Sequence, residues 1–320
     1  MKPPNFFIVG APKAGTTALA KYLGTHPQVF MSPVKEPHYF ATDLSRPIYV
    51  QDESIYLDLF RGATDKHIAV GEASVWYLYS SVAVQLIRHF NPLARIIVMV
   101  RNPLELVPSL HSQLLFSKCE EQVSLENALK MQEERSRGER LPRSVVSGRF
   151  PARCLSYTKV AKTGEQLERL LEIFPASQVK VILFDDFKTD PRRIYEETLS
   201  FLDVPSDSRD SFPRVNENKV RRIKWLGNPV NSGSRLGAVL LKIRHALRLR
   251  GFGIIGWLSI LNSKRTQRVP LDRNLRRELA DVFRADVAKL GMIMDRELSS
   301  WLEPRDDVGS IQEEDSEVTR

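Results

Sequence analysis

The stretch FFIVGAPKAGTTALAKYL, residues 6–23, joins an apolar run to a glycine-containing turn and then to helix-forming residues. Residues 6–9 favour a buried β-strand, and residues 16–23 favour an α-helix. Between them, Gly10 and Gly15 enclose four residues. Backbone N–H groups at a helix start that follows such a turn are well placed to hold phosphate oxygens. The stretch therefore predicts a phosphate-binding loop between a strand and a helix.

The lysine of this loop is in an unusual position. Loops that bind nucleoside triphosphates carry a lysine directly after the second glycine, whereas this sequence has Thr16 there and Lys13 three residues earlier. The next buried strand, residues 94–100, ends at Arg101 rather than at an aspartate that could help hold magnesium. We therefore expect a phosphate site that works without a metal. A plain turn with a solvated Lys13 is the alternative.

The elements after this loop follow an alternating pattern. ARIIVMV, residues 94–100, is typical of a parallel strand covered on both faces. Asn102 suits a helix N-cap and Pro103 the first helical position, while Pro108 is expected to kink or restart that helix.

The pattern continues with a helix over 157–174, a strand over 179–184 and a helix over 191–202. A closing helical segment is expected over 271–302. The predicted fold is α/β: a central, mostly parallel sheet flanked by helices, with a phosphate-binding loop and a helical C-terminal segment.

Composition limits the classes of protein that fit. The chain has 320 residues with 42% hydrophobic content, which excludes disorder of the whole. Lys plus Arg exceed Asp plus Glu by 47 − 39 = 8, which favours anionic ligands or surfaces. Cys119 and Cys154 form no metal-ligand spacing, and the N-terminal apolar run is too short for a signal sequence. We therefore expect a cytoplasmic protein.

The last third of the chain differs from the rest. Residues 219–268 are strongly basic, with a candidate amphipathic helix near 236–249 that suits peripheral contact with an anionic membrane. The apolar run 252–261 is too short to cross a bilayer. Few aromatic residues lie among the basic ones, so nucleic acid is not an expected partner.

We predict one domain over residues 5–302. Its α/β nucleotide-binding core spans 5–218, and its basic, mainly helical part spans 219–302. Residues 303–320 are expected to form an acidic, disordered tail.

Three motifs resemble those of sulfotransferases that use 3'-phosphoadenosine-5'-phosphosulfate, particularly the branch of heparan-sulfate sulfotransferases and their bacterial relatives. FFIVGAPKAGTTALAKYLGTHPQVFMSPVKEPHYF looks like the family's 5'-phosphosulfate loop and catalytic loop. IIVMVRNPLELVPSLHS is similar to its 3'-phosphate element, and NENKVRR, residues 216–222, to its late nucleotide-covering loop. Ala73 departs from the pattern, because glycosaminoglycan-type relatives carry a lysine there. The resemblance implies sulfuryl transfer from that donor.

The same resemblance implies which residues bind the donor. The loop residues would hold its 5'-phosphosulfate, and residues at the end of the 94–100 strand and in the next helix would hold its 3'-phosphate. The late loop would cover the nucleotide. These residues are Lys13, Ala14, Gly15, Thr16, Thr17, Arg101, Ser109, Lys219, Val220 and Arg221.

The resemblance also points to a base that removes the proton of the acceptor. Glu36 matches the family's catalytic glutamate, with His38 as an alternative base or partner, and Lys13 would neutralise the leaving phosphate. An ordinary glutamate has a pKa of ~4.3, so efficient base catalysis would require burial or a neighbouring charge to raise it. Glu36 in a plain salt bridge with Lys35 or Lys13 is the structural alternative.

Two other functions remain open from the residues alone. A nucleotide or small-molecule kinase shares the glycine loop and the α/β pattern, although Lys13 and Arg101 argue against it. A non-enzymatic protein could use its basic segment to bind an anionic surface. The acceptor of a sulfotransferase could be a small molecule, a carbohydrate or a lipid. The sequence does not indicate the oligomeric state of the protein.

Overall fold

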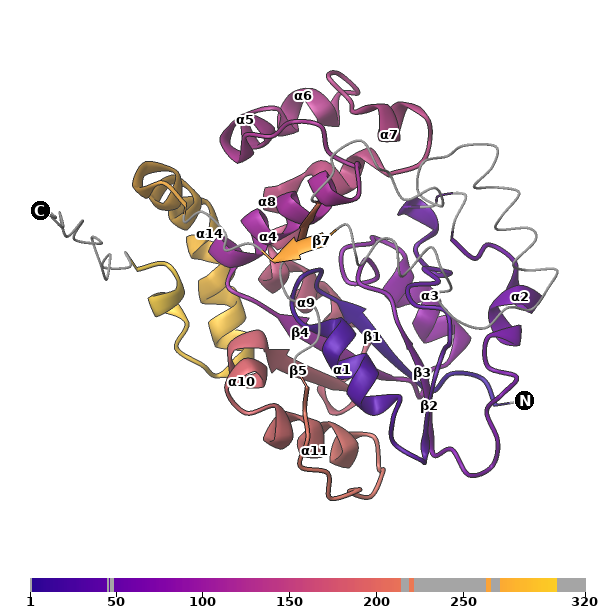
Figure 1. Cartoon of the computed structure of the whole chain (residues 1–320). Helices are drawn as coiled ribbons and strands as arrows, with labels where there is room; N and C mark the ends of the chain where they lie inside the picture. Colours follow the sequence, from indigo (N-terminus) through magenta and orange to yellow (C-terminus); the bar gives the residue numbers. More distant parts are fainter. Residues whose placement is uncertain are drawn as a thin grey trace, which may run out of the picture.

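The computed structural model describes residues 2–44, 46, 49–213, 219–221, 263–265 and 271–303. Its strands are β1 (Phe6–Gly10), β2 (Val29–Met31), β3 (Ala69–Ala73), β4 (Arg95–Val100), β5 (Val179–Leu183), β6 (Lys219–Arg221) and β7 (Ser263–Arg265). Its longer helices are α1 (Thr16–Leu23), α3 (Ala83–Phe90), α4 (Pro103–Phe116), α9 (Thr163–Ile173), α11 (Pro191–Phe201) and α14 (Arg273–Met294). Figure 1 shows how these elements are arranged.

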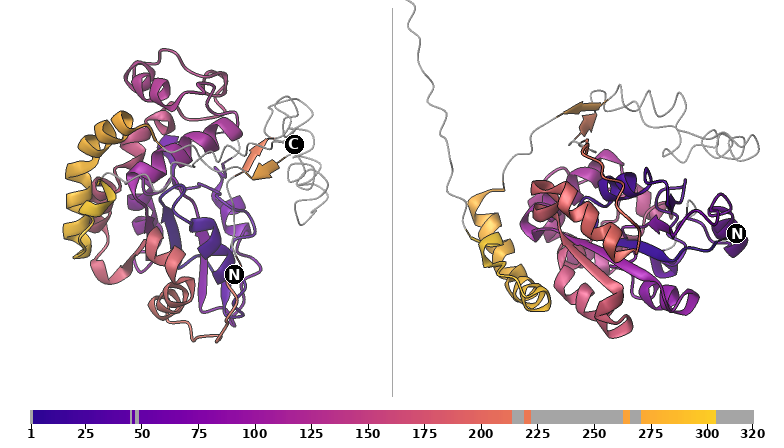
Figure 2. Two further views of the ribbon diagram at one scale, coloured as in Figure 1. Left: turned by 60° about the vertical axis from the view of Figure 1, so that its left-hand side comes forward. Right: turned by 90° about the horizontal axis from the view of Figure 1, so that it is seen from below.

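Five strands form one parallel sheet in the order β2-β3-β1-β4-β5. The chain moves one way from β1 to β2 and the other way from β3 to β4. Because such crossovers are right-handed, α1 and α3 must cover opposite faces of the sheet. α11 packs beside α1, and α9 packs beside α3 and α14. The sheet is therefore covered on both faces, as the apolar strands predicted (Figure 2).

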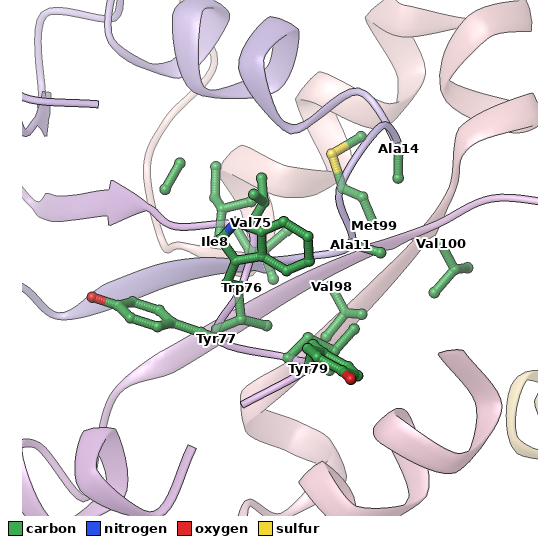
Figure 3. Close-up of a cluster of buried hydrophobic side chains, with 14 of the residues drawn as sticks. Ile8, Ala11, Ala14, Val75, Trp76, Tyr77, Tyr79, Val98, Met99 and Val100 are labelled. Atoms are coloured by element: carbon green, nitrogen blue, oxygen red, sulfur yellow. The ribbon is translucent and has the colours of Figure 1, made fainter. Parts of the chain in front are cut away.

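The centre of the core lies where β1 and β4 run side by side. Every residue of β1 is buried, as are all residues of β4 after Arg95. Figure 3 shows Met99 on the side of Ala11 and Ala14, while Val98 and Val100 point to the opposite face. This alternation follows from the period of two in a strand. The start of the glycine-containing loop is thus part of the core, which gives the loop a firm base.

A helical layer covers the end of the sheet at which the strands terminate (Figure 1). Its short helices are α5 (Leu125–Lys130), α6 (Gln132–Ser136), α7 (Arg143–Val146), η2 (Ala152–Leu155) and α8 (Tyr157–Ala161). Arg135 and Glu120 form a buried two-pronged ion pair with N–O distances of 2.6 and 2.9 Å. The Tyr157 hydroxyl donates to the same carboxylate at 2.7 Å. This buried group ties α6 to α8 and to the end of α4.

The remaining elements are short or terminal. They are η1 (Thr42–Leu44), α2 (Glu53–Asp58), η3 (Ala176–Gln178), α10 (Phe184–Thr189) and η4 (Ser299–Trp301). β6 and β7 pair antiparallel in a separate two-stranded sheet. None of the helices among the described residues has the length and apolar character needed to span a membrane. The predicted helix over 236–249, the apolar run 252–261 and the tail after Glu303 lie outside the described residues.

The α/β prediction is confirmed, with one local correction. The helix predicted over 157–174 is two helices, α8 and α9, because the backbone leaves helical geometry at Lys162. The Asp286 carboxylate of α14 accepts hydrogen bonds from the N–H groups of Gly164 and Glu165, at 3.0 and 2.8 Å, and so caps a new helix start. α4 runs across Pro108 without a restart.

Candidate active site

The loop after β1 presents backbone N–H groups at the start of α1. Gly15 is the N-cap with φ 93°, a left-handed conformation that suits glycine. A Cβ at Gly15 would also come within 3.0 Å of the Phe184 ring. The N–H groups of the first helical turn, including those of Thr16 and Thr17, have no carbonyl partner within the helix. The loop can therefore hold an anion, as the sequence predicted.

Arg101 joins this loop to the end of β4. Because β1 and β4 are parallel neighbours, both end at the same edge of the sheet. The Arg101 guanidinium donates to the backbone carbonyl of Lys13 at 3.0 Å. The Lys13 ammonium in turn donates to the side-chain oxygen of Gln113 on α4, at 3.1 Å. The two predicted phosphate-binding elements are thus in direct contact.

The guanidinium of Arg101 is also held in place by the Glu105 carboxylate and the Phe184 ring. Glu105, one helical turn away, accepts from Arg101 at 2.8 Å, and the guanidinium carbon lies 4.5 Å from the centre of the Phe184 ring. Ser109 follows one turn later on α4 and is buried, with 1% exposure. Arg101 and Ser109 therefore lie on one stretch of chain, about two helical turns apart.

The loop that carries Glu36 and His38 is attached to the end of β3. The Glu36 N–H donates to the carbonyl of Ala73 at 3.2 Å, and the His38 N–H donates to the Ser74 hydroxyl at 3.1 Å. β3 lies beside β1, and Ser74 donates its own N–H to Ile8 of β1. Glu36 and His38 are therefore held at the same sheet edge as the glycine-containing loop.

Both loops contain non-glycine residues with a left-handed backbone. Among the described residues, eight that are not glycine have positive φ, and three of them are Lys13 (64°), Glu36 (57°) and His38 (51°). Such conformations persist only where the surroundings hold them, and they are common at functional sites. The strain thus marks the same three side chains that the resemblance singled out as catalytic.

Glu36 and His38 form a close pair. Glu36 Oε2 lies 3.6 Å from His38 Nε2, and its other oxygen contacts the Lys35 ammonium. Burial acts to raise the pKa of Glu36, but His38 and Lys35 outweigh it and lower this pKa to about 2. Burial lowers the pKa of His38, despite the neighbouring Glu36. The carboxylate is therefore ionised and the imidazole neutral near pH 7, so the free protein does not meet the condition of a raised Glu36 pKa that efficient base catalysis requires.

A second, fully buried carboxyl lies beneath this loop. Glu72 of β3 accepts hydrogen bonds from Ser74 at 2.6 Å, Tyr77 at 2.7 Å and Tyr56 at 3.1 Å. Ser74 is also the acceptor for the His38 N–H. Burial raises the pKa of Glu72 to about 7, although all three hydroxyls act to lower it. Glu72 therefore organises the hydroxyl groups on which the loop rests.

The raised pKa of Glu72 predicts a pH-dependent stability. Its ordinary value is 4.5, so the folded state favours the protonated form, and stability should fall as the pH rises from about 4.5 through 7. In the Glu72→Gln variant this fall should be absent. Across this pH range the unfolding free energy should therefore fall by roughly 3 kcal/mol more in the wild type than in the variant. Urea unfolding at pH 5 and pH 8 measures it.

A matched variant checks the cause. Tyr56→Phe removes one hydrogen-bond donor to the Glu72 carboxylate, which should raise the pKa of Glu72 further. The loss of stability should therefore extend to higher pH than in the wild type. If wild type and Glu72→Gln show the same change of unfolding free energy between the two pH values, Glu72 is not the titrating group.

The structure brings most of the predicted site residues together and adds several. Lys13, Ala14, Gly15, Thr16 and Thr17 form one loop in contact with Arg101. Lys219, Val220 and Arg221 form β6, and their side chains lie outside the described part of the chain. Sequence reasoning missed Glu72, Ser74, Gln113 and Glu105. Only Glu105 had a signal, because its four-residue spacing from Arg101 on a helix favours an ion pair.

A metal site is not visible in the described part of the chain, where no three His, Cys, Asp or Glu side chains cluster as metal ligands do. Cys119 and Cys154 are both free thiols. Burial raises the pKa of the Cys154 thiol, which makes it an unreactive core residue.

Comparison with known proteins gives a consistent result. A model of the sulfotransferase domain family matches residues 3–224. Human carbohydrate sulfotransferase 15 is 31% identical over 143 residues, which cover 32% of this chain and 26% of that protein. Human bifunctional heparan sulfate N-deacetylase/N-sulfotransferase 3 is 29% identical over 207 residues, covering 63% of this chain and 22% of that protein. The matches thus span about a quarter of the length of these relatives.

A solved structure is similar over nearly the whole chain. The crystal structure of a sulfotransferase from Alicyclobacillus acidocaldarius superposes with a TM-score of 0.68 at 28% identity. The match covers 95% of this chain and 100% of the other. The likeness therefore extends past the family model into the C-terminal part.

Proposed function

This chain belongs to the sulfotransferase domain family, and from that premise we propose that it moves a sulfuryl group from 3'-phosphoadenosine-5'-phosphosulfate to a hydroxyl or amine of an acceptor. One observation supports this most: the Arg101 guanidinium touches the backbone of the Lys13 loop at 3.0 Å. A phosphate-binding turn and a second cation beside it suit a nucleotide with phosphates at both the 5' and 3' positions.

The described residues fit such a donor. The N–H groups of Gly15, Thr16 and Thr17 and the Lys13 ammonium would hold the 5'-phosphosulfate, with the positive end of the α1 dipole behind them. Arg101 would hold the 3'-phosphate by charge-assisted hydrogen bonds, together with Ser109. Glu105 now neutralises Arg101, so the nucleotide phosphate would compete with this carboxylate for the guanidinium.

The transfer itself needs alignment and charge stabilisation. The acceptor oxygen or nitrogen forms a bond to sulfur as the bond from sulfur to the 5'-phosphate oxygen breaks, and the acceptor proton passes to Glu36. The Lys13 ammonium and the loop N–H groups stabilise the negative charge that grows on the leaving phosphate. His38 Nε2 lies 3.6 Å from the Glu36 carboxylate, and its proposed role is to position that carboxylate, with the neutral imidazole as the alternative base.

The low pKa of Glu36 in the free protein is compatible with this role. A carboxyl with a pKa of about 2 is a weak base. The sulfonate and phosphates of the donor would bring negative charge beside Glu36 and attract the Lys35 ammonium away from it. Both effects raise the pKa of a carboxyl. Donor binding would thus turn Glu36 into a stronger base when the acceptor is in place.

The acceptor is proposed only by class. The relatives named above include a carbohydrate sulfotransferase and a heparan sulfate N-sulfotransferase, so a carbohydrate is favoured over a small metabolite or a lipid. Ala73 lacks the lysine of glycosaminoglycan-type relatives, and its buried side chain offers no cation to an acidic chain. We further propose that the reaction takes place in the cytoplasm and needs no metal.

Transfer of label tests the function directly. The full chain is incubated with donor labelled in the sulfuryl group, a cell extract as the acceptor source, and a chelator. We expect label in a product that is not inorganic sulfate. Magnesium-dependent transfer from γ-labelled ATP, with none from the sulfuryl donor, would instead establish the kinase alternative.

A further inference from the structure

A basic cavity that shares no lining residue with the Lys13–Arg101 site is formed by residues of α6, η2, α8 and α9; Figure 1 shows where α6, α8 and α9 lie. Its volume is about 520 Å³, within the range of small-ligand sites. None of the predicted donor-binding or catalytic residues lines it. Its charged lining consists of five cations and one carboxylate: Arg135, Arg153, Lys159, Lys162, Arg169 and Glu165. We call it the basic pocket.

The protein itself neutralises only some of these charges. Arg135 is paired with Glu120, Arg153 with Asp43 at 2.7 Å, and Lys162 with Glu165 at 2.9 Å. Arg169 donates to two backbone carbonyls, which carry no net charge. Within the described ranges, no carboxylate lies in ion-pair contact with Arg169 or Lys159. The basic pocket therefore keeps an excess of two positive charges.

Two buried polar atoms of the lining have no hydrogen-bond partner among the described residues. They are Nε of Arg135 and Oε1 of Gln166, and both residues are only 4% exposed. The amide orientation of Gln166 is fixed, because its Nε2 donates to the carbonyls of Lys159 and Val160 at 2.9 and 3.1 Å. A buried donor and a buried acceptor are costly when unpaired. Together they suit a ligand with both anionic oxygens and hydroxyl groups.

The wall of the basic pocket is connected to the loop of the proposed base. Asp43, five residues after His38, accepts from Arg153 and from the hydroxyl and N–H of Ser81. Tyr79, six residues after the end of β3, donates its hydroxyl to the carbonyl of Arg153 at 2.9 Å. The wall of the basic pocket is thus bound to the segment that continues from the Glu36–His38 loop and to the segment that follows β3.

We propose that the basic pocket is an anion-binding subsite for the acceptor, which takes a sulfate, carboxylate or phosphate group carried by a hydroxylated framework such as a sugar. The inference rests on the proposed sulfuryl transfer and adds the chemistry of the acceptor: a molecule that is already anionic at a position other than the one to be sulfated. Lys159 and Arg169 supply the charge, and Gln166 receives a hydroxyl.

Binding of glucose 6-sulfate to the full chain, measured by titration calorimetry, tests the subsite. We expect Lys159→Ala to weaken this binding at least tenfold. The control Lys66→Ala, which removes an exposed lysine outside the cavity, should bind as the wild type does. Both variants should bind 3'-phosphoadenosine 5'-phosphate unchanged, which shows that they are folded and that the donor site is separate.

Glucose and inorganic sulfate serve as comparison ligands. Weaker binding of each than of glucose 6-sulfate supports a subsite that reads both the anion and the hydroxyls. Equal binding of inorganic sulfate, or equal binding of glucose 6-sulfate by Lys159→Ala and wild type, overturns the proposal. Failure of the enzyme function would appear differently, as absence of label transfer and of 3'-phosphoadenosine 5'-phosphate binding.

Discussion

Glu36→Gln is expected to slow sulfuryl transfer by ~10³-fold, the middle of the range for loss of a general base. The amide keeps the size of the side chain and its place beside His38 but cannot accept the acceptor proton. Among the described residues, Glu36 makes no hydrogen bond or ion pair with the Lys13 loop, which is proposed to hold the phosphates. Binding of 3'-phosphoadenosine 5'-phosphate should therefore stay within about twofold of wild type. Single-turnover kinetics with labelled donor measure the step itself.

Two further variants show whether the loss of rate is specific to proton removal by Glu36. Glu126→Gln, on the exposed surface of α5, should transfer at the wild-type rate. His38→Asn should reduce the rate less than Glu36→Gln, because it removes a positioning contact and not the base. If Glu36→Gln transfers at full rate, Glu36 has no role in proton removal.

Lys13→Ala is expected to lower kcat by ~10²- to 10³-fold, the usual effect of removing one group that stabilises developing charge. The ammonium lies at the loop and donates to the neutral amide oxygen of Gln113, so it keeps its positive charge for the leaving phosphate. Alanine tolerates the φ of 64° no better than lysine does, so the loop backbone should gain no freedom. The expected change is therefore in the rate, with a smaller change in donor binding.

The control for this variant lies on the helix that follows the loop. Lys21→Ala removes an exposed lysine in the last turn of α1 and should leave kcat unchanged. Lys13→Arg keeps the charge and should recover part of the rate. A Lys13→Ala protein with unaltered kcat would place the leaving phosphate elsewhere.

Local patterns predicted the part of the fold that forms the donor site. The strand, loop and helix over residues 6–23 and the strand that ends before Arg101 are encoded by neighbouring residues. Their meeting at one sheet edge follows from parallel pairing alone. This is why the sequence alone predicts one site for Lys13 and Arg101, which are 88 residues apart.

Features that depend on distant partners could not be predicted in this way. The break between α8 and α9 needs the carboxylate of Asp286, which lies 122 residues beyond Gly164. The organising role of Glu72 needs Tyr56 and Tyr77 to fold over it. The lowered pKa of Glu36 has the same origin, because only the folded loop shows that Lys35 and His38 outweigh burial.

The central claim is that the Lys13 loop binds the 5'-phosphate and Arg101 the 3'-phosphate of one nucleotide. Titration calorimetry of wild type and Arg101→Ala with 3'-phosphoadenosine 5'-phosphate and with adenosine 5'-phosphate tests it. Loss of a charge-assisted contact of about 1.5–3 kcal/mol predicts that Arg101→Ala binds the bisphosphate ~10- to 100-fold more weakly. Binding of the 5'-monophosphate should be nearly unchanged. An equal loss for both nucleotides, or none for either, would contradict the account.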